Sequence, residues 1–431
     1  MTTGEVSARR SFGRPFPNIS RNVAIALAAG IAIAALMLFV VFPVFGYKLD
    51  HVCFLVTGKR LIDLDLELLY TPTGMGPWAY MPPAALFFAP FSAVGMETGS
   101  TLSVLFNFLC LSLLIILMAN HFCRPGARDL KTFGLIAAAT CAYHFIVWES
   151  LNLGQVDIFL TLLASLFLFY NPPAPTSGAL FAVMVNFKPQ FAIFTLLQFY
   201  RRGLLLILWI AFAFAALAAA YIALTLVIGK PNLYFDQMLQ YKVVAGAITQ
   251  SKDVTNQSLD GALRRLFSAG DYLGRYSPAW YAPGPMSMHV AVLPNAVVNG
   301  LSVFLRAAFM ALAALSLRAA RREGRIDPEY FFIVLAMAIP IVSPLFWQAH
   351  MIQLLPVSTW LLVRGAESGR WPVVVPLVCA LLAIAVGNPG VLGQAGADTA
   401  QAYSLYTLAI LMHAVLCLTY PRWRGRKADC A

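Results

Sequence analysis

Long apolar stretches separated by short polar or basic segments run through almost the whole chain. Stretches of roughly 18 or more apolar residues are typical of membrane-spanning helices. The pattern predicts about twelve spans, at residues 22–45, 82–95, 98–119, 132–148, 155–170, 178–200, 203–228, 289–317, 330–346, 349–364, 371–387 and 402–420. No internal repeat, low-complexity linker or soluble domain interrupts this pattern. We therefore expect one integral membrane domain over residues 1–431.

Basic residues gather beside the ends of the predicted spans. They are Arg9, Arg10, Arg14 and Arg21, then Arg318, Arg321, Arg322 and Arg325, and finally Arg422, Arg424, Arg426 and Lys427. Because cytoplasmic loops retain lysine and arginine, residues 1–21 and 421–431 are predicted to be cytoplasmic. The first apolar run is longer than the hydrophobic core of a signal peptide, and no small-residue cleavage pattern follows it. It is interpreted as an uncleaved anchor.

One segment conflicts with this topology. Twelve crossings place the basic stretch "HFCRPGARDLK" (121–131) outside, against the charge rule. In an alternative topology, 82–95 is a re-entrant segment and 178–200 breaks at "NFKPQ" (186–190). Irregular backbone at membrane depth is tolerated where it lines a cavity within the protein, so both topologies stay open.

Two loops are predicted to face outside, at 46–81 and 229–288. The first contains "KRLIDLDLELLY", in which Leu61, Leu64 and Leu68 follow helical spacing with acidic residues between them. This spacing predicts an amphipathic helix at the membrane interface, with Asp63, Asp65 and Glu67 on its solvated face. The second contains "KDVTNQSLDGALRRLF" and the proline- and glycine-rich "SPAWYAPGPMS".

Composition excludes a soluble protein. Only 11% of the residues are charged and 60% are hydrophobic, whereas soluble domains carry about 25% charged residues. The net charge of +11 lies mainly at span ends, so it indicates topology and contact with membrane lipid, not nucleic-acid binding. The seven cysteines show neither a metal-binding spacing nor a disulfide framework.

Ionisable groups in or beside a span are costly, so their positions are informative. Most of the informative ones fall in short stretches: Asp50–His51, "YMPP" (80–83), "WESLNLGQVD" (148–157), "NFKPQ" (186–190), "NQSLDGALRR" (256–265) and "SPLFWQAH" (343–350). Asp50, the 229–288 loop and "SPLFWQAH" lie on the outer side under either topology. We expect outer-face loops to form one active site.

These residue types suit glycosyl transfer from a lipid-linked donor. An enzyme facing outward has no access to nucleotide sugars, so its donor would be a polyprenyl phosphate sugar in the bilayer. A carboxylate can deprotonate the acceptor hydroxyl as it attacks the anomeric carbon. Arginine or lysine can bind the donor phosphate and offset the charge on the leaving group. Aromatic side chains such as Trp347 and Tyr80 can stack on sugar faces.

The order "D-x-x-x-F … LLY … YMPP … FFAPFSAVG … LGQVD … FKPQ … NQSLDGALRR … SPLFWQAHMIQLLP", from about Asp50 to Pro356, resembles glycosyltransferase family 87. That family includes polyprenyl-phosphomannose-dependent α-1,2-mannosyltransferases and belongs to the GT-C superfamily. The resemblance implies an all-α, polytopic transmembrane helical bundle of GT-C type. It also implies a catalytic aspartate at Asp50, and it matches Trp347 and His350 to the family's SP-x-x-W-x-x-H stretch.

We therefore expect Asp50 and His350 to be catalytic. Arg264 and Lys188 are expected to bind the donor phosphate, and Tyr80, Asn256, Trp347 and Gln155 to bind substrate. No oxygen-ligand motif for a divalent cation is visible, so neither a metal nor a cofactor is predicted.

Several alternatives stay open. Lys188 can instead form an ion pair or extend toward water, and of the adjacent Arg264 and Arg265 at most one is expected to contact phosphate. The family's usual Gly-Gln-x-Asn ends here in Asp157, which is either a ligand or a helix N-cap. The family often has Val-Tyr after its aspartate, where this chain has Cys53-Phe54, a difference that bears on sugar or acceptor specificity.

The predicted function is transfer of a hexose, with mannose favoured, to a lipid or glycan acceptor on the outer face of the cytoplasmic (inner) membrane. One alternative is a flippase or transporter for a lipid-linked sugar. Such transporters usually contain internal repeats, and the polar residues here gather on one side, which favours the enzyme. Another alternative is an envelope glycan polymerase or ligase, which shares the chemistry and differs in its acceptor. The sequence distinguishes neither mannose from arabinose nor retention from inversion.

Overall fold

A computed structural model describes residues 49–73, 78–123, 128–170, 172–196, 203–249, 256–269, 289–322 and 328–423. Over these residues the chain is helical and contains no strand; an isolated antiparallel bridge joins Asn256 to Trp347. The predicted all-α class is therefore confirmed. The predicted first span at 22–45, the segment 1–21, "SPAWYAPGPMS" and residues 424–431 lie outside the described residues.

The described residues form two compact units. The first unit comprises residues 49–136 and 150–244, and the second comprises 137–149 and the described residues from 245 onward. The expectation of a single domain over residues 1–431 stays a prediction.

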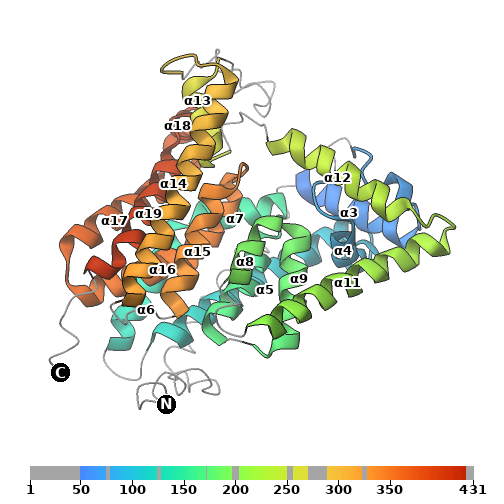
Figure 1. Cartoon of the computed structure of the whole chain (residues 1–431), viewed down its shortest axis with the longest axis horizontal. Helices are drawn as coiled ribbons and strands as arrows, with labels where there is room; N and C mark the ends of the chain where they lie inside the picture. Colours follow the sequence, from blue (N-terminus) through green and yellow to red (C-terminus); the bar gives the residue numbers. More distant parts are fainter. Residues whose placement is uncertain are drawn as a thin grey trace. The chain divides into compact units, whose positions relative to one another are not determined.

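The first unit consists of short and long helices around an aromatic core. Its elements are α3 (Leu49–Ile62), η2 (Leu66–Leu68), η3 (Pro82–Ala84), α4 (Ala85–Ser92), α5 (Met96–Phe122), most of α6 (Arg128–Ala142), the end of α7 (His144–Leu153), α8 (Asp157–Tyr170), α9 (Ala174–Phe187), η4 (Pro189–Phe194), α11 (Leu204–Val227) and most of α12 (Leu233–Thr249). Helix α11 packs along α9, and α8 packs on α5 (Figure 1). At the α3–α4 contact, a Cβ on Gly58 would lie 2.8 Å from the Phe88 backbone, so only glycine permits this approach.

The second unit is a bundle of longer helices. Its main elements are α13 (Leu259–Phe267), α14 (Asn295–Arg322), α15 (Pro328–Val342), η5 (Gln348–Leu354), α16 (Leu355–Ser368), α17 (Trp371–Val386), α18 (Pro389–Ala402) and α19 (Leu405–Trp423). Helix α19 packs against α14, α15 and α17 (Figure 1). The interior contains Trp360, whose indole N–H donates to Glu329 at 3.1 Å.

Four of the described helices are long and apolar enough to cross a membrane, namely α5, α11, α14 and α19. They correspond to the predicted spans 98–119, 203–228, 289–317 and 402–420. The bent pair α6 and α7 gives a fifth candidate if it counts as one span, matching 132–148. The full set of about twelve spans stays a prediction.

Two other segments agree with the alternative topology. Segment 82–95 contains only η3 and the eight-residue α4, which is too short to cross a hydrocarbon core of about 30 Å at about 1.5 Å per residue. Segment 178–200 leaves the α-helix at Phe187, and Lys188 is extended with φ −137° and ψ 97°. Lys188 precedes Pro189, and a residue before proline is disfavoured in the α conformation.

The predicted amphipathic helix through Leu61, Leu64 and Leu68 is wrong. Helix α3 ends at Ile62, and Leu64 takes a positive φ of 60° that turns the chain. Leu64 and Leu68 are exposed, whereas Leu66 and Leu69 are fully buried. The apolar face therefore follows the turn and η2, not a continuous helix.

Candidate active site

Asp50 lies in the first turn of α3 and is partly buried. A carboxylate is favoured there because the N-terminal end of a helix carries partial positive charge. Its Oδ2 atom accepts a hydrogen bond from the side-chain amide of Gln155, which is 105 residues away in the chain.

Gln155 reaches Asp50 because the chain turns tightly between α7 and α8. Gly154 forms this turn with φ +73°, a conformation that L side chains rarely adopt. A Cβ on Gly154 would lie 1.5 Å from the ring of His51, so the glycine also permits a close approach to α3. The His51 ring is held from α5 by the hydroxyl groups of Ser100 at 2.9 Å and Ser103 at 3.2 Å.

Tyr80 joins the same cluster through its hydroxyl group, which donates to the Gln155 side-chain oxygen at 3.4 Å. Its ring is buried, with ring centroids 5.5 Å from Phe54, 5.2 Å from Trp78 and 5.4 Å from Phe187. The part of Tyr80 that reaches the polar cluster is therefore its hydroxyl group, and its ring packs in the aromatic core.

Lys188 and Asp157 form a buried ion pair. The Lys188 ammonium lies 2.7 Å and 2.9 Å from the two carboxylate oxygens of Asp157. Lys188 follows the end of α9, and Asp157 is the first residue of α8. The ion-pair alternative for Lys188 is thus the arrangement observed, and phosphate binding by Lys188 stays a prediction.

The surroundings of Asp50 change its acidity. Burial raises the pKa of Asp50 to about 6, although the hydrogen bond from Gln155 and the positive charge of Lys188 lower it. Asp157 raises it slightly further through charge repulsion. Helix α3 is not among the candidate membrane spans. A carboxylate with a pKa in this range is suited to accept a proton near neutral pH.

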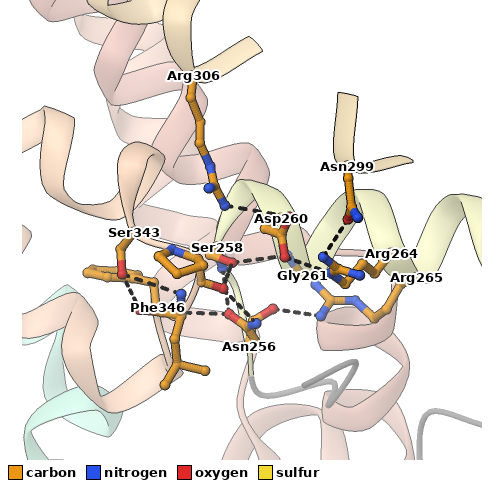
Figure 2. Close-up of polar contacts among 12 residues, drawn as sticks. Asn256, Ser258, Asp260, Gly261, Arg264, Arg265, Asn299, Arg306, Ser343 and Phe346 are labelled. Atoms are coloured by element: carbon orange, nitrogen blue, oxygen red, sulfur yellow. Dashed lines mark hydrogen bonds and ion pairs between the residues drawn. The ribbon is translucent and has the colours of Figure 1, made fainter. Parts of the chain in front are cut away.

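The second unit contains the other predicted site residues, around the start of α13. Asn256 pairs with Trp347 in the isolated bridge, and its side-chain oxygen accepts from the backbone N–H groups of Ser258 (3.2 Å) and Phe346 (3.1 Å). Figure 2 shows Asn256 at the centre of these contacts. Asn256 therefore joins the "NQSLDG" stretch to the "SPLFWQAH" stretch.

Ser258 caps α13. Its hydroxyl oxygen accepts from the backbone N–H of Gly261 at 3.0 Å, and the hydroxyl donates to the Pro344 carbonyl at 2.9 Å. This cap fixes where the helix begins and so which way the two following arginines point.

The side chains of the adjacent Arg264 and Arg265 diverge. Arg264 donates from Nε to Asp260 at 2.7 Å and from Nη2 to Asn299 at 2.8 Å. Arg265 is fully buried and donates to the Asn256 carbonyl at 2.6 Å and to the hydroxyl of Ser404 at 2.8 Å. Arg265 is therefore a structural contact, and Arg264 is the more accessible of the two.

His350 lies in η5 beside Trp347. Its Nδ1 accepts from the backbone N–H of Trp347 at 3.2 Å, and the two ring centroids are 5.7 Å apart. The structure thus brings the predicted residues together in two groups. Asp50, Tyr80, Gln155 and Lys188 gather in the first unit, and Asn256, Arg264, Trp347 and His350 in the second.

Sequence reasoning missed two charged residues of the second group. Asp260 accepts from Arg264, and Arg306 of α14 lies 3.5 Å from Asp260. An arginine within the otherwise apolar 289–317 segment was the signal that could have identified Arg306. In the described part of the chain, no group of three or more His, Cys, Asp or Glu residues is arranged to hold a metal ion.

The model of glycosyltransferase family 87 matches residues 78–344, more than half of the chain. No curated protein and no solved structure matches. The matched region includes Tyr80, Gln155, Lys188, Asn256 and Arg264, whereas Asp50, Trp347 and His350 lie outside it.

Proposed function

Because the chain belongs to glycosyltransferase family 87, we propose that it transfers a hexose, with mannose favoured, from a polyprenyl phosphate sugar to a lipid or glycan acceptor. The chain is a glycosyltransferase with apolar helices long enough to span a membrane. The location in the inner membrane, the outward-facing site, the GT-C architecture and the twelve-span topology belong to the proposal.

The main structural support for this proposal is the hydrogen bond from Gln155 to Asp50. In the proposed step, the acceptor hydroxyl oxygen forms a bond to the anomeric carbon of the donor sugar. The bond from that carbon to the phosphate oxygen breaks, and polyprenyl phosphate leaves with the bonding electrons. The hydroxyl proton passes to Asp50, whose Oδ2 is held by Gln155 so that Oδ1 is oriented to receive it.

The other proposed roles follow from the second group. Arg264 binds the donor phosphate, a role supported by its charge and by a side chain that is 15% exposed. His350 positions the substrate or the leaving phosphate, and Asn256 and Trp347 contribute to substrate binding.

Family membership counts against the flippase alternative, because it indicates sugar transfer. The polymerase or ligase alternative shares the chemistry, so only the acceptor separates it from the proposal. Mass spectrometry of the envelope glycolipids from a deletion strain tests which acceptor is used. A glycolipid that accumulates with one sugar fewer than in the wild type identifies that acceptor.

The donor class is tested with purified protein in nanodiscs. The protein is given an acceptor lipid extract and either mannosyl phosphoryl polyprenol or a nucleotide-linked mannose, each with a radiolabelled sugar. We expect label to move to the acceptor only from the polyprenyl donor. Transfer from the nucleotide sugar alone would overturn the proposed donor.

A further inference from the structure

Arg306 is a charged residue inside a long apolar helix, where such residues are rare. It is eleven residues into the 28-residue α14, or about 17 Å along the helix axis at about 1.5 Å per residue. Helix α14 is one of the candidate membrane spans. Ionisable residues in such helices are costly and usually serve an ion or substrate site.

Asp260 satisfies only part of the hydrogen-bonding capacity of the Arg306 guanidinium group. Its Nη2 lies 3.5 Å from an Asp260 carboxylate oxygen, too far for a good hydrogen bond. The Nε and Nη2 atoms are buried without a hydrogen-bond partner. Buried polar atoms are nearly always hydrogen-bonded, so these two nitrogen atoms indicate a missing acceptor.

Asp260 is shared between two guanidinium groups. Arg264 donates to one carboxylate oxygen, and Arg306 approaches the other. Figure 2 shows the Asp260 side chain between those of Arg306 and Arg264, with Asn299 above Arg264. The Asp260 side chain is 6% exposed, whereas those of Arg264 and Arg306 are 15% and 20% exposed. One carboxylate therefore orients two arginines.

We infer that Arg264 and Arg306, oriented by Asp260, form an anion site for the phosphate group of a lipid. Guanidinium groups suit this ligand because their planar N–H donors match phosphate oxygens in pairs. The assignment of that lipid as the polyprenyl phosphate donor rests on the proposed function. Arg306 and Asp260 thereby become parts of the donor site, Arg306 as a phosphate ligand and Asp260 as a positioning residue.

Binding to the purified full-length protein tests the site without requiring catalysis. The protein is placed in nanodiscs of neutral phosphatidylcholine and titrated with farnesyl phosphate, a short polyprenyl phosphate, or with farnesol, which lacks the phosphate. We expect the Arg306→Gln variant to bind farnesyl phosphate about ten- to a hundredfold more weakly, the loss typical of a charge-assisted contact. Farnesol binding should be unchanged.

Arg318→Gln is the matched control, because Arg318 is an exposed arginine on the same helix. It should bind farnesyl phosphate as the wild type does. Equal binding by wild type and Arg306→Gln would overturn the site. If Arg306→Gln does not fold, Arg306→Lys serves instead: farnesyl phosphate should raise its Tm less than that of the wild type, and an equal rise would overturn the site.

A second titration identifies the source of the phosphate. The same variants are assayed in discs containing phosphatidylglycerol. Arg306-dependent binding of phosphatidylglycerol, without binding of farnesyl phosphate, would overturn the donor assignment and assign the site to a membrane phospholipid. Asp50→Asn should still bind farnesyl phosphate, so a failure of the catalytic proposal leaves this test intact.

Discussion

The ammonium group of Lys188 lies 2.7 Å and 2.9 Å from the two carboxylate oxygens of Asp157, and both side chains are buried. The pair joins the end of α9 to the start of α8. The positive charge of Lys188 also lowers the pKa of the nearby Asp50. This ion pair is therefore both a structural contact and part of the electrostatic environment of the proposed base.

Removing one member of this ion pair should destabilise the protein more than removing both members. Lys188→Gln or Asp157→Asn alone leaves one charge of this buried pair without the opposite charge beside it, at a cost of about 3–5 kcal/mol. The double variant removes both charges, so its loss of stability should be smaller than that of either single variant. Thermal unfolding in detergent measures the three variants.

The exposed pair of Lys230 and Glu67 is the control. Lys230→Gln should change stability by about 0–1 kcal/mol, as is usual for surface ion pairs. If Lys188→Gln is no more destabilised than Lys230→Gln, the structural role assigned to the buried pair is wrong. A selective rise in donor KM in a stable Lys188→Gln variant would instead support the predicted phosphate role.

The pH dependence of transfer should follow Asp50. The carboxylate accepts a proton only when it is ionised, and its pKa is raised to about 6. We therefore expect kcat/KM to fall as the pH is lowered through about 6 and to level off above it. A profile that is flat between pH 5 and 8 would contradict the role of Asp50 as the base.

Replacing Gln155 should move this profile. The hydrogen bond from Gln155 lowers the pKa of Asp50, so Gln155→Leu should shift the midpoint to higher pH and reduce kcat. Tyr80→Phe loses only the 3.4 Å contact with Gln155 and should shift the midpoint less. A Gln155→Leu enzyme with lower activity and an unmoved midpoint would assign Gln155 to substrate binding alone.

Gly154→Ala should disturb the Asp50 cluster through geometry. A positive φ costs an L-residue about 1–2 kcal/mol, and the new Cβ would also collide with the His51 ring. Gly369→Ala is a matched control, since Gly369 is left-handed with φ +65° and has open space around its Cβ position. We expect Gly154→Ala to lower Tm and activity clearly more than Gly369→Ala. Equal effects would show that the turn tolerates displacement of His51.

The sequence predicted the features that depend on local pattern. The long apolar stretches of the sequence at α5, α11, α14 and α19 each predicted a helix long enough to span a membrane. The X-Pro signal at Lys188–Pro189 made a break in 178–200 one of two open alternatives, and the helix ends there. By contrast, the positive φ at Leu64 has no such signal, so the spacing of Leu61, Leu64 and Leu68 predicts a helix that is longer than the observed one.

The contacts within the site could not be predicted in the same way. Gln155 and Asp50 are 105 residues apart, and Lys188 and Asp157 are 31 apart, so only tertiary packing brings them together. Residue type identified Asp50, Gln155 and Lys188 as candidates. It could not show that Gln155 holds Asp50, or that Lys188 is neutralised by Asp157.

The most direct test of the account is sugar transfer by the purified Asp50→Asn enzyme. The substitution keeps the shape of the side chain and an oxygen that can accept from Gln155, but it removes the base. In nanodiscs with mannosyl phosphoryl polyprenol and acceptor, we expect a wild-type Tm, wild-type binding of farnesyl phosphate, and turnover reduced by at least about 10²-fold. Transfer at a near wild-type rate would show that Asp50 is not the catalytic base.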